Sequence, residues 1–554
     1  MHEQARLVEV VAGIAADVVA PVDDQHALVE LAGKPLGQHA AGEAAAHDEV
    51  VEGAGAVALG CAGEWGRHGM CGGGGWEGRL PLGNRHARKS CSRWHLDCWE
   101  LDLPKACTSP RRLPPMATFA TSQAGPEPIV VVGGGAAGLE LVVQLARHRK
   151  AVGRKVVLVD RAFSHLWKPR LHEIATAMQS EAAAENSFIG HASDHGYRFE
   201  PGALLDLDPA GHQIVLDALM APDGTVVLPS RRIAYSTLVL ALGSEENDFG
   251  TAGAREHCLF LNTPEQAGAI RTALLAGALK VARGEQQALS IAVIGGGATG
   301  VELAAEIKHA VDAFRQHEPG LDASRIALVV VEASERLLSA NPKEVSDYAT
   351  ASLRRRGVEL VLGEHVTSVD ADGVVLGSGR RIDAHLRIWT AGIRGPRIFE
   401  HMPALALTRS GRVRVDALLR CADLPNIYAI GDCAEWTDPA TGRPAPYTAQ
   451  IASAQARYLG DAFERLEAGR PVAPFRFESA GAVVSLADRG AAGNLTTRFG
   501  RRSQEHLIQG LSARLLYALL YRRHELAILG WRRSLARWLA NWLERSYQPT
   551  IKLH

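Results

Sequence analysis

Glycines occur twice in the chain at the spacing G-x-G-x-x-G, each time directly after a short apolar run. The first glycine of such a set allows a tight turn, the second lets the backbone approach a pyrophosphate, and the third lets a helix pack close to a strand. The helix that follows offers free N–H groups and a partial positive charge to phosphates. The glycines of the two sets are Gly133, Gly135, Gly138, Gly295, Gly297 and Gly300, with Ala136 and Ala137 inside the first set. A chain that carries this device twice is expected to bind two dinucleotides and to transfer electrons between them.

Each glycine set is followed by a second apolar run that ends in a carboxylate, Asp160 after the first set and Glu332 after the second. The second spacing exceeds the usual distance of about 20 residues, because the intervening helical segment is longer. A carboxylate at this place accepts hydrogen bonds from ribose hydroxyls and repels a 2′-phosphate. Glu332 therefore favours NADH over NADPH, although Arg161 and Arg336 lie close enough to moderate that preference.

Three later apolar runs end in glycine and must position the remaining contacts. Two of them end at Gly243 and Gly392, and we interpret them as crossovers between two domains. The third ends in Gly431 and Asp432, where the chain returns to the first domain and the carboxylate can accept a hydrogen bond from a ribityl hydroxyl. This order predicts an α/β fold with two Rossmann-like dinucleotide-binding domains, in which an NADH domain is nested within a split FAD domain.

The residues from about 126 to 554 resemble the type II NADH dehydrogenases, the single-chain NADH:quinone oxidoreductases of respiratory membranes, and the bacterial branch in particular. The motifs that carry this resemblance are HLWKPRLHEIA from His165, LVLALGSEENDFG from Leu238, GGGATGVE from Gly295, AIGDCA from Ala429 and the closing KLH. The resemblance implies FAD in the first site, NADH in the second and a membrane quinone as the electron acceptor, without proton pumping.

The resemblance also implies roles for three side chains. Glu302 corresponds to an acid near the flavin and nicotinamide that helps relay protons to the reduced quinone. Gln450 would orient the quinone carbonyl, and Lys168 would contact the flavin or its surroundings. Each has a plainer explanation: Glu302 as a first-turn glutamate favoured by the helix dipole, Gln450 as a polar helix residue facing water, and Lys168 as a solvated loop charge.

Two positions depart from the family pattern. Arg170 stands where the family run K-P-L-L has its first leucine. The family motif A-Q-x-A-x-Q is shifted here, so that its second glutamine, Gln455, comes one residue late. These departures weaken predictions about the quinone headgroup.

Other flavoprotein classes are disfavoured by the cysteines. Disulfide reductases carry a C-x₄-C pair soon after the first glycine loop, whereas residues 139–257 contain no cysteine. Sulfide:quinone reductases remain an alternative because Cys258, Cys421 and Cys433 exist, but those enzymes do not need the intact second glycine set. A nicotinamide-sensing protein without turnover is a further alternative, and no metal site is predicted.

Composition and charge favour a peripheral membrane protein. The net charge is −1, which gives no general case for nucleic acid binding. No run of about twenty apolar residues is present to span a bilayer. The basic C-terminal region instead carries a helical stripe that suits the lipid headgroup layer, and this stripe consists of Trp531, Leu535, Trp538, Leu539 and Trp542. We expect the protein at the cytoplasmic side of the inner membrane, with packing of this helix on the protein or on a homodimer partner as the alternative.

The chain is expected to have four regions. Residues 1–125 form a disordered or spurious extension, with translation expected to start at Met116. Residues 126–255 and 400–475 form the FAD domain, residues 256–399 the NADH domain, and residues 476–554 an amphipathic helical region that associates with the membrane.

Overall fold

A computed structural model describes residues 127–148, 153–487, 490–499 and 502–547 of the protein. The predicted N-terminal extension and the closing KLH lie outside these residues.

The first of two large sheets is parallel and has the strand order β23-β11-β1-β2-β5. Its strands are β1 (Ile129–Val132), β2 (Val156–Asp160), β5 (Arg198–Pro201), β11 (Thr237–Leu240) and β23 (Ile427–Ala429). β1 is buried along its whole length, as expected for a strand covered on both faces.

The second large sheet is also parallel, with the order β13-β20-β14-β15-β16. It consists of β13 (Leu259–Phe260), β14 (Leu289–Ile294), β15 (Ile326–Glu332), β16 (Val358–Leu362) and β20 (Leu386–Trp389). All five strands fall between β11 and β23 of the first sheet. The predicted nesting of one dinucleotide-binding domain within the other is thereby confirmed.

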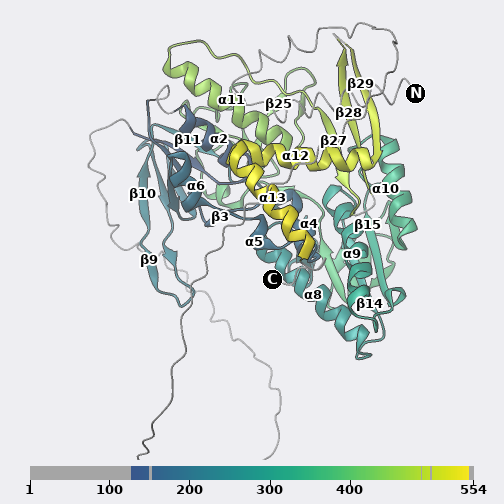
Figure 1. Cartoon of the computed structure of the whole chain (residues 1–554). Helices are drawn as coiled ribbons and strands as arrows, with labels where there is room; N and C mark the ends of the chain where they lie inside the picture. Colours follow the sequence, from purple (N-terminus) through teal and green to yellow (C-terminus); the bar gives the residue numbers. More distant parts are fainter. Residues whose placement is uncertain (1–126, 149–152, 488–489, 500–501, 548–554) are drawn as a thin grey trace, which may run out of the picture. The chain divides into compact units, whose positions relative to one another are not determined.

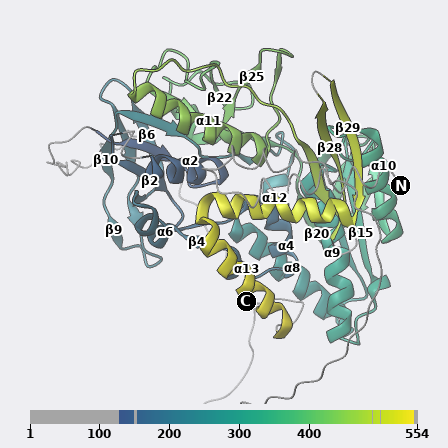
Figure 2. The same cartoon turned by 45° about the horizontal axis from the view of Figure 1, so that its top comes forward.

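Five long helices cover the two sheets (Figures 1 and 2). In the first domain α2 (Ala136–Arg147) packs against α11 (Ala449–Glu467), which returns to it from far along the chain. In the second, α8 (Pro264–Ala282), α9 (Ala298–His317) and α10 (Lys343–Arg355) cover the sheet. The short helix α4 (Leu171–Ala175) contacts both α8 and α9, and so joins the two domains.

The C-terminal region contains the helices that we predicted, and a small sheet precedes them. It begins with a three-stranded antiparallel sheet, formed by residues 481–485, 491–499 and 502–510. Its strands are β27 (Gly481–Ser485), β28 (Ala491–Phe499) and β29 (Arg502–Gly510). Only then do α12 (Leu511–Leu529) and α13 (Trp531–Tyr547) follow.

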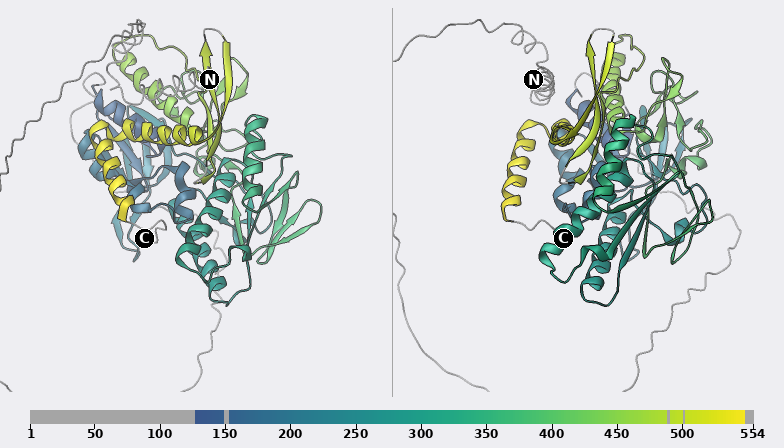
Figure 3. Two further views of the ribbon diagram at one scale, coloured as in Figure 1. Left: turned by 45° about the vertical axis from the view of Figure 1, so that its right-hand side comes forward. Right: turned by 90° about the vertical axis from the view of Figure 1, so that its right-hand side faces the viewer.

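Helix α12 bridges the molecule, since it contacts both α2 and the strands β27, β28 and β29. Helix α13 turns away from the end of α12 (Figure 3). Within the described residues no helix is long and apolar enough to cross a membrane.

Two smaller antiparallel sheets flank the large ones: β6 (Leu204–Asp208), β7 (Gln213–Leu216) and β10 (Arg231–Ala234), and β17 (Val366–Val369), β18 (Gly373–Leu376) and β19 (Arg381–Asp383). The remaining elements are short: β3 (Ser164–His165), η1 (Lys168–Arg170), α5 (Glu181–Ala184), β4 (Asn186–Ser187), α6 (Phe188–His195), β8 (Leu219–Met220), β9 (Val226–Leu228), β12 (Glu245–Glu246), α7 (Ala254–His257), η2 (Ala323–Arg325), β21 (Ile393–Arg394), η3 (Arg397–His401), β22 (Val413–Arg414), η4 (Gly431–Cys433), β24 (Ala434–Glu435), β25 (Thr437–Asp438) and β26 (Arg443–Pro444).

Candidate active site

The first glycine loop joins β1 to α2, and its three glycines meet three different steric demands. Gly133 has φ +106°, and a Cβ there would overlap the carbonyl oxygen of Ala241. A Cβ on Gly138 would overlap the carbonyl oxygen of Gly133. Gly135, at the N-cap of α2, has no atom within 4 Å of a Cβ position. The open side of this loop is therefore at Gly135, where a pyrophosphate can reach the helix N-terminus.

The second loop, between β14 and α9, repeats this geometry. Gly295 has φ +111°, and a Cβ there would lie 2.7 Å from the backbone nitrogen of Ala391. Gly300 packs against the carbonyl of Gly295, and Gly297 faces open space. The two loops are equivalent cradles on two separate sheets.

The two acids expected to bind ribose lie beside these loops. The Gly134 N–H donates to Asp160 Oδ2 over 2.5 Å, and the Gly296 N–H donates to Glu332 Oε2 over 2.5 Å. The second oxygen of each carboxylate accepts the backbone N–H two residues further along the chain. Since a carboxylate has about four acceptor sites, each side chain is held in place and keeps sites for ribose hydroxyls.

The return strand β23 brings Gly431 and Asp432 to the first cradle. Asp432 Oδ2 accepts the hydroxyl of Ser244 at 3.1 Å, and Lys168 Nζ donates to that same hydroxyl oxygen at 3.2 Å. Ser244 follows Gly243, which has φ +76°. Lys168 is exposed but not merely a solvated charge, because this chain of hydrogen bonds places its ammonium beside the predicted flavin contacts.

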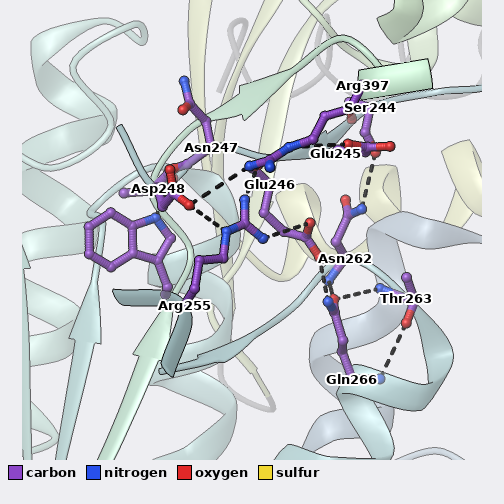
Figure 4. A network of polar contacts seen from close by, with 12 residues as sticks. Ser244, Glu245, Glu246, Asn247, Asp248, Arg255, Asn262, Thr263, Gln266 and Arg397 are labelled. Carbon is purple, nitrogen blue, oxygen red and sulfur yellow. Dashed lines mark hydrogen bonds and ion pairs between the residues drawn. The ribbon is translucent and has the colours of Figure 1, made fainter. Parts of the chain in front are cut away.

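The crossover after Gly243 is clamped by a polar network (Figure 4). Asn262 Nδ2 donates to the Ser244 carbonyl at 3.0 Å. Arg255 pairs with Asp248, and Arg397 Nη2 lies 3.9 Å from the same carboxylate. The second crossover, at Gly392, is joined to the first because β12 pairs with β21. This network fixes the chain segments that connect the two cradles.

Glu302 lies on α9 behind the second glycine loop and is only 8% exposed. Its Oε1 accepts the N–H of Ser485 at 3.0 Å, and its Oε2 lies 3.5 Å from His172 Nδ1. Burial raises the pKa of Glu302 to about 8, the Ser485 hydrogen bond opposes that rise, and the charges of Glu173 and Glu306 add to it. The carboxyl therefore carries its proton at neutral pH, as a proton donor requires.

Comparison with known proteins identifies the family. A protein family described as "Pyridine nucleotide-disulphide oxidoreductase" matches residues 127–456 of the chain. A type II NADH:quinone oxidoreductase from Haemophilus influenzae is 33% identical over 77% of this chain and 99% of its own length. The chain belongs to the type II NADH:quinone oxidoreductases. A second member, from Mycobacterium tuberculosis, is 26% identical over 65% of this chain and 77% of its own length.

Solved structures show the fold and do not by themselves separate neighbouring classes. The NDH2 of Plasmodium falciparum in complex with NADH superposes with a TM-score of 0.64 at 17% identity, covering 77% of this chain and 100% of that one. The sulfide:quinone oxidoreductase of Aquifex aeolicus superposes with a TM-score of 0.58 at 15% identity, covering 77% and 96%. The fold is thus shared, and the assignment to type II NADH:quinone oxidoreductases rests on the sequence relation.

The three cysteines within the described part of this type II oxidoreductase show no sign of thiol chemistry. Cys258, Cys421 and Cys433 are buried and unpaired. Burial raises the pKa of Cys258 and of Cys433 to about 12 and raises the pKa of Cys421 further. The thiolate is the reactive form, and these three side chains are held in the thiol form at neutral pH, which argues against the sulfide:quinone alternative.

The two glutamines of the shifted motif have different surroundings in this member of the family. Gln450 is half-buried in the first turn of α11, after the N-cap Thr448. Gln455 is 3% exposed, and its Oε1 accepts the N–H of Gly431 at 2.7 Å. A shift of one residue rotates a helical side chain by about 100°, which carries Gln455 away from solvent to the backbone N–H of Gly431, just after β23.

Three residues that were not predicted from the sequence surround Glu302 and the first loop. His172 stands in the HLWKPRLHEIA motif, so this motif was the available signal. Tyr517 on α12 has a buried hydroxyl without a hydrogen-bond partner among the described residues, and burial and the charge of Glu302 raise its pKa well above the usual value. His524, also on α12, meets His165 with Nε2 atoms 3.1 Å apart. No local pattern marks α12 as part of the site.

His165 connects α12 to the first glycine loop. Its Nδ1 lies 2.8 Å from the Gly134 carbonyl oxygen, and Trp167 stacks on His524 with ring centroids 3.8 Å apart. Burial lowers the pKa of His165 to about 4, so the ring is neutral at physiological pH.

Proposed function

We propose that this protein oxidises NADH, using bound FAD, and passes two electrons to a membrane quinone without pumping protons. The observation that carries the proposal is the pair of complete dinucleotide cradles, in nested domains, within a chain that belongs to the type II NADH:quinone oxidoreductases. FAD supplies the hydride acceptor, and the protein supplies binding, orientation and electrostatics.

The cradles fit the two nucleotides because both loops are open where a pyrophosphate must approach, at Gly135 and Gly297. We assign the FAD contacts to Gly133, Gly135, Ala136, Ala137, Gly138, Asp160, Lys168, Gly243, Gly431 and Asp432, and the NADH contacts to Gly295, Gly297, Gly300, Glu332 and Gly392. In these terms residues 126–255 and 400–475 form the FAD domain and residues 256–399 the NADH domain.

Glu302 and Gln450 are proposed to serve the quinone. The buried carboxyl of Glu302 would give a proton to the reduced quinone, which its raised pKa supports. Gln450 would orient a quinone carbonyl by hydrogen bonding from the first turn of α11. Replacement of either residue by leucine is expected to lower quinone reduction while FAD stays bound, as measured by turnover with a long-chain quinone and by flavin absorbance.

The proposal is tested by anaerobic titration of the purified yellow protein with NADH, followed by addition of a quinone. Bleaching of the flavin absorbance by NADH and its recovery with quinone are the expected results. Bleaching by sulfide but not by NADH would favour the sulfide:quinone alternative, and bleaching without recovery would favour a nicotinamide sensor.

The C-terminal helices are proposed to bind the cytoplasmic face of the inner membrane. Their exposed apolar side chains are Leu511, Leu515, Leu520, Trp531, Leu535, Leu539, Trp542 and Leu543. Trp538, which we placed on this stripe, is instead half-buried, because its Nε1 donates to Glu525 Oε2 at 2.6 Å. The rest of the stripe suits a helix lying in the headgroup layer. The alternative is that the same face forms a homodimer contact.

A vesicle flotation assay separates these uses. The double substitution of Trp531 and Trp542 by serine is expected to abolish flotation with anionic vesicles. Serine at Val226 and Val227, which are also more than half exposed, is the matched control and should leave flotation unchanged. Unchanged flotation of the tryptophan variant, together with a changed sedimentation mass, would assign this face to dimer formation.

A further inference from the structure

The carboxyl of Glu302 shares its buried pocket with an imidazole. His172 is 2% exposed on α4, and its Nδ1 lies 3.5 Å from Glu302 Oε2. The other carboxyl oxygen accepts the Ser485 N–H. One side of the carboxyl is therefore held by a backbone group, and the other side faces Nδ1 of the His172 ring.

The proton of the neutral His172 ring lies on Nδ1. Its Nε2 is buried and has no hydrogen-bond partner among the described residues, whereas the ring donates a hydrogen bond to the backbone carbonyl of Pro169. Burial lowers the pKa of His172 to about 4, which keeps the ring neutral at physiological pH. With the proton on Nδ1, the ring can donate to Glu302 whenever that carboxyl is ionised.

Other charged groups face the same pocket from three elements. Glu173 on α4 is paired with Arg170, whose Nε lies 2.9 Å from the carboxylate. Glu306 lies one turn further along α9 and is 6% exposed. Tyr517 approaches from α12 and is held neutral by burial. Both glutamates disfavour the ionised form of Glu302, so that form needs a donor other than the Ser485 N–H.

We propose that His172 is a positioning residue that holds Oε2 of Glu302 and stabilises the carboxylate formed when Glu302 gives a proton to the quinone. This inference rests on the proposed function. NADH brings two electrons and one proton as hydride, whereas a quinol needs two protons. The second proton leaves Glu302 as its O–H bond breaks and the quinol O–H bond forms, and the medium then restores it. His172 stabilises the Glu302 carboxylate until the medium restores its proton.

Replacement of His172 by phenylalanine and by asparagine tests this role in the FAD-containing protein. The flavin is first reduced anaerobically with NADH, and its re-oxidation by a soluble quinone is then followed across the pH range. Flavin reduction by NADH should be unchanged in both variants. Loss of a hydrogen bond to a charged group should slow re-oxidation by roughly tenfold or more in His172→Phe. The pH midpoint of re-oxidation should also rise, because the carboxyl then holds its proton more tightly.

His172→Asn should recover much of the rate and the wild-type midpoint, because its amide can point an N–H at Oε2. The same asparagine change in a Glu302→Gln background should have no further effect, since no carboxylate forms there. His191→Asn is the matched control: His191 is also buried, but its ring lies 2.9 Å from the hydroxyl of Tyr197. It should leave the pH midpoint in place.

Equal slowing by His172→Asn in both backgrounds would overturn the inference, as would an unshifted midpoint in both His172 variants. Failure of the wild-type protein to be re-oxidised by quinone would instead refute the proposed function. The two failures are therefore distinguishable.

Discussion

The buried carboxyl of Glu302 should make the stability of this protein fall as the pH rises, and Glu302→Gln should remove that dependence. Burial raises the native pKa to about 8, from about 4.5 in the unfolded chain. The native state therefore binds the proton more tightly, and the stability that this provides is lost as the pH rises from about 4.5 and is gone above about 8. One pH unit within this window corresponds to about 1.4 kcal/mol. Between pH 4.5 and pH 7 the stability of the glutamine variant relative to the wild type should therefore rise by about 3 kcal/mol.

The assay is urea unfolding of wild type and variant, both FAD-loaded, at a series of pH values from 5 to 9. The difference in the free energy of unfolding should grow with pH and level off above about pH 8, because all other titrating groups are common to the two proteins. Glu344→Gln, on the exposed side of α10, is the control and should give a constant difference. A constant difference for Glu302→Gln as well would show that this carboxyl is already ionised at neutral pH and would refute the reasoning.

Three further predictions follow from the geometry. Gly297→Ala should raise the KM for NADH and leave FAD bound, whereas Gly135→Ala should weaken FAD retention. At either position the added methyl group would contact no protein atom and would project into the open side of the loop, where the nucleotide is expected. Loss of FAD from the Gly297 variant would contradict this. Gln455→Leu should weaken FAD binding by about 1–3 kcal/mol, since it leaves the Gly431 N–H without its acceptor, and fluorescence of released flavin measures this; unchanged release would show that Gln455 does not hold the return strand. Acid should loosen α12, because His165 is neutral when folded with a pKa of about 4, so its stability contribution is lost as the pH falls from about 6.5 to about 4. Protease cleavage within α12 should rise over that range, and equal cleavage at pH 7 and pH 4.5 would contradict it.

The sequence determined the two cradles, because their requirements are local. A glycine is needed wherever a Cβ would strike a neighbouring backbone atom, and Gly133, Gly138, Gly295 and Gly300 all meet that need within one strand–turn–helix unit. The acids follow from the same unit, since parallel pairing brings the end of the next strand to the loop. The nested order of the two sheets could also be predicted from local sequence, because the strands that cross between the domains each end in a glycine.

Only the tertiary structure decided the surroundings of Glu302. Apart from burial, the groups that set its protonation are Glu173 on α4, the Ser485 N–H on β27 and Glu306 on α9 itself. These elements are far apart in the chain and carry no shared periodicity. The position of Gln455 around the axis of α11 decided that it contacts the Gly431 N–H. The packing of α12 near the first glycine loop brought His524 to His165. Burial and pair distances depend on how distant segments pack, so the spacing of residues along the chain could not reveal them.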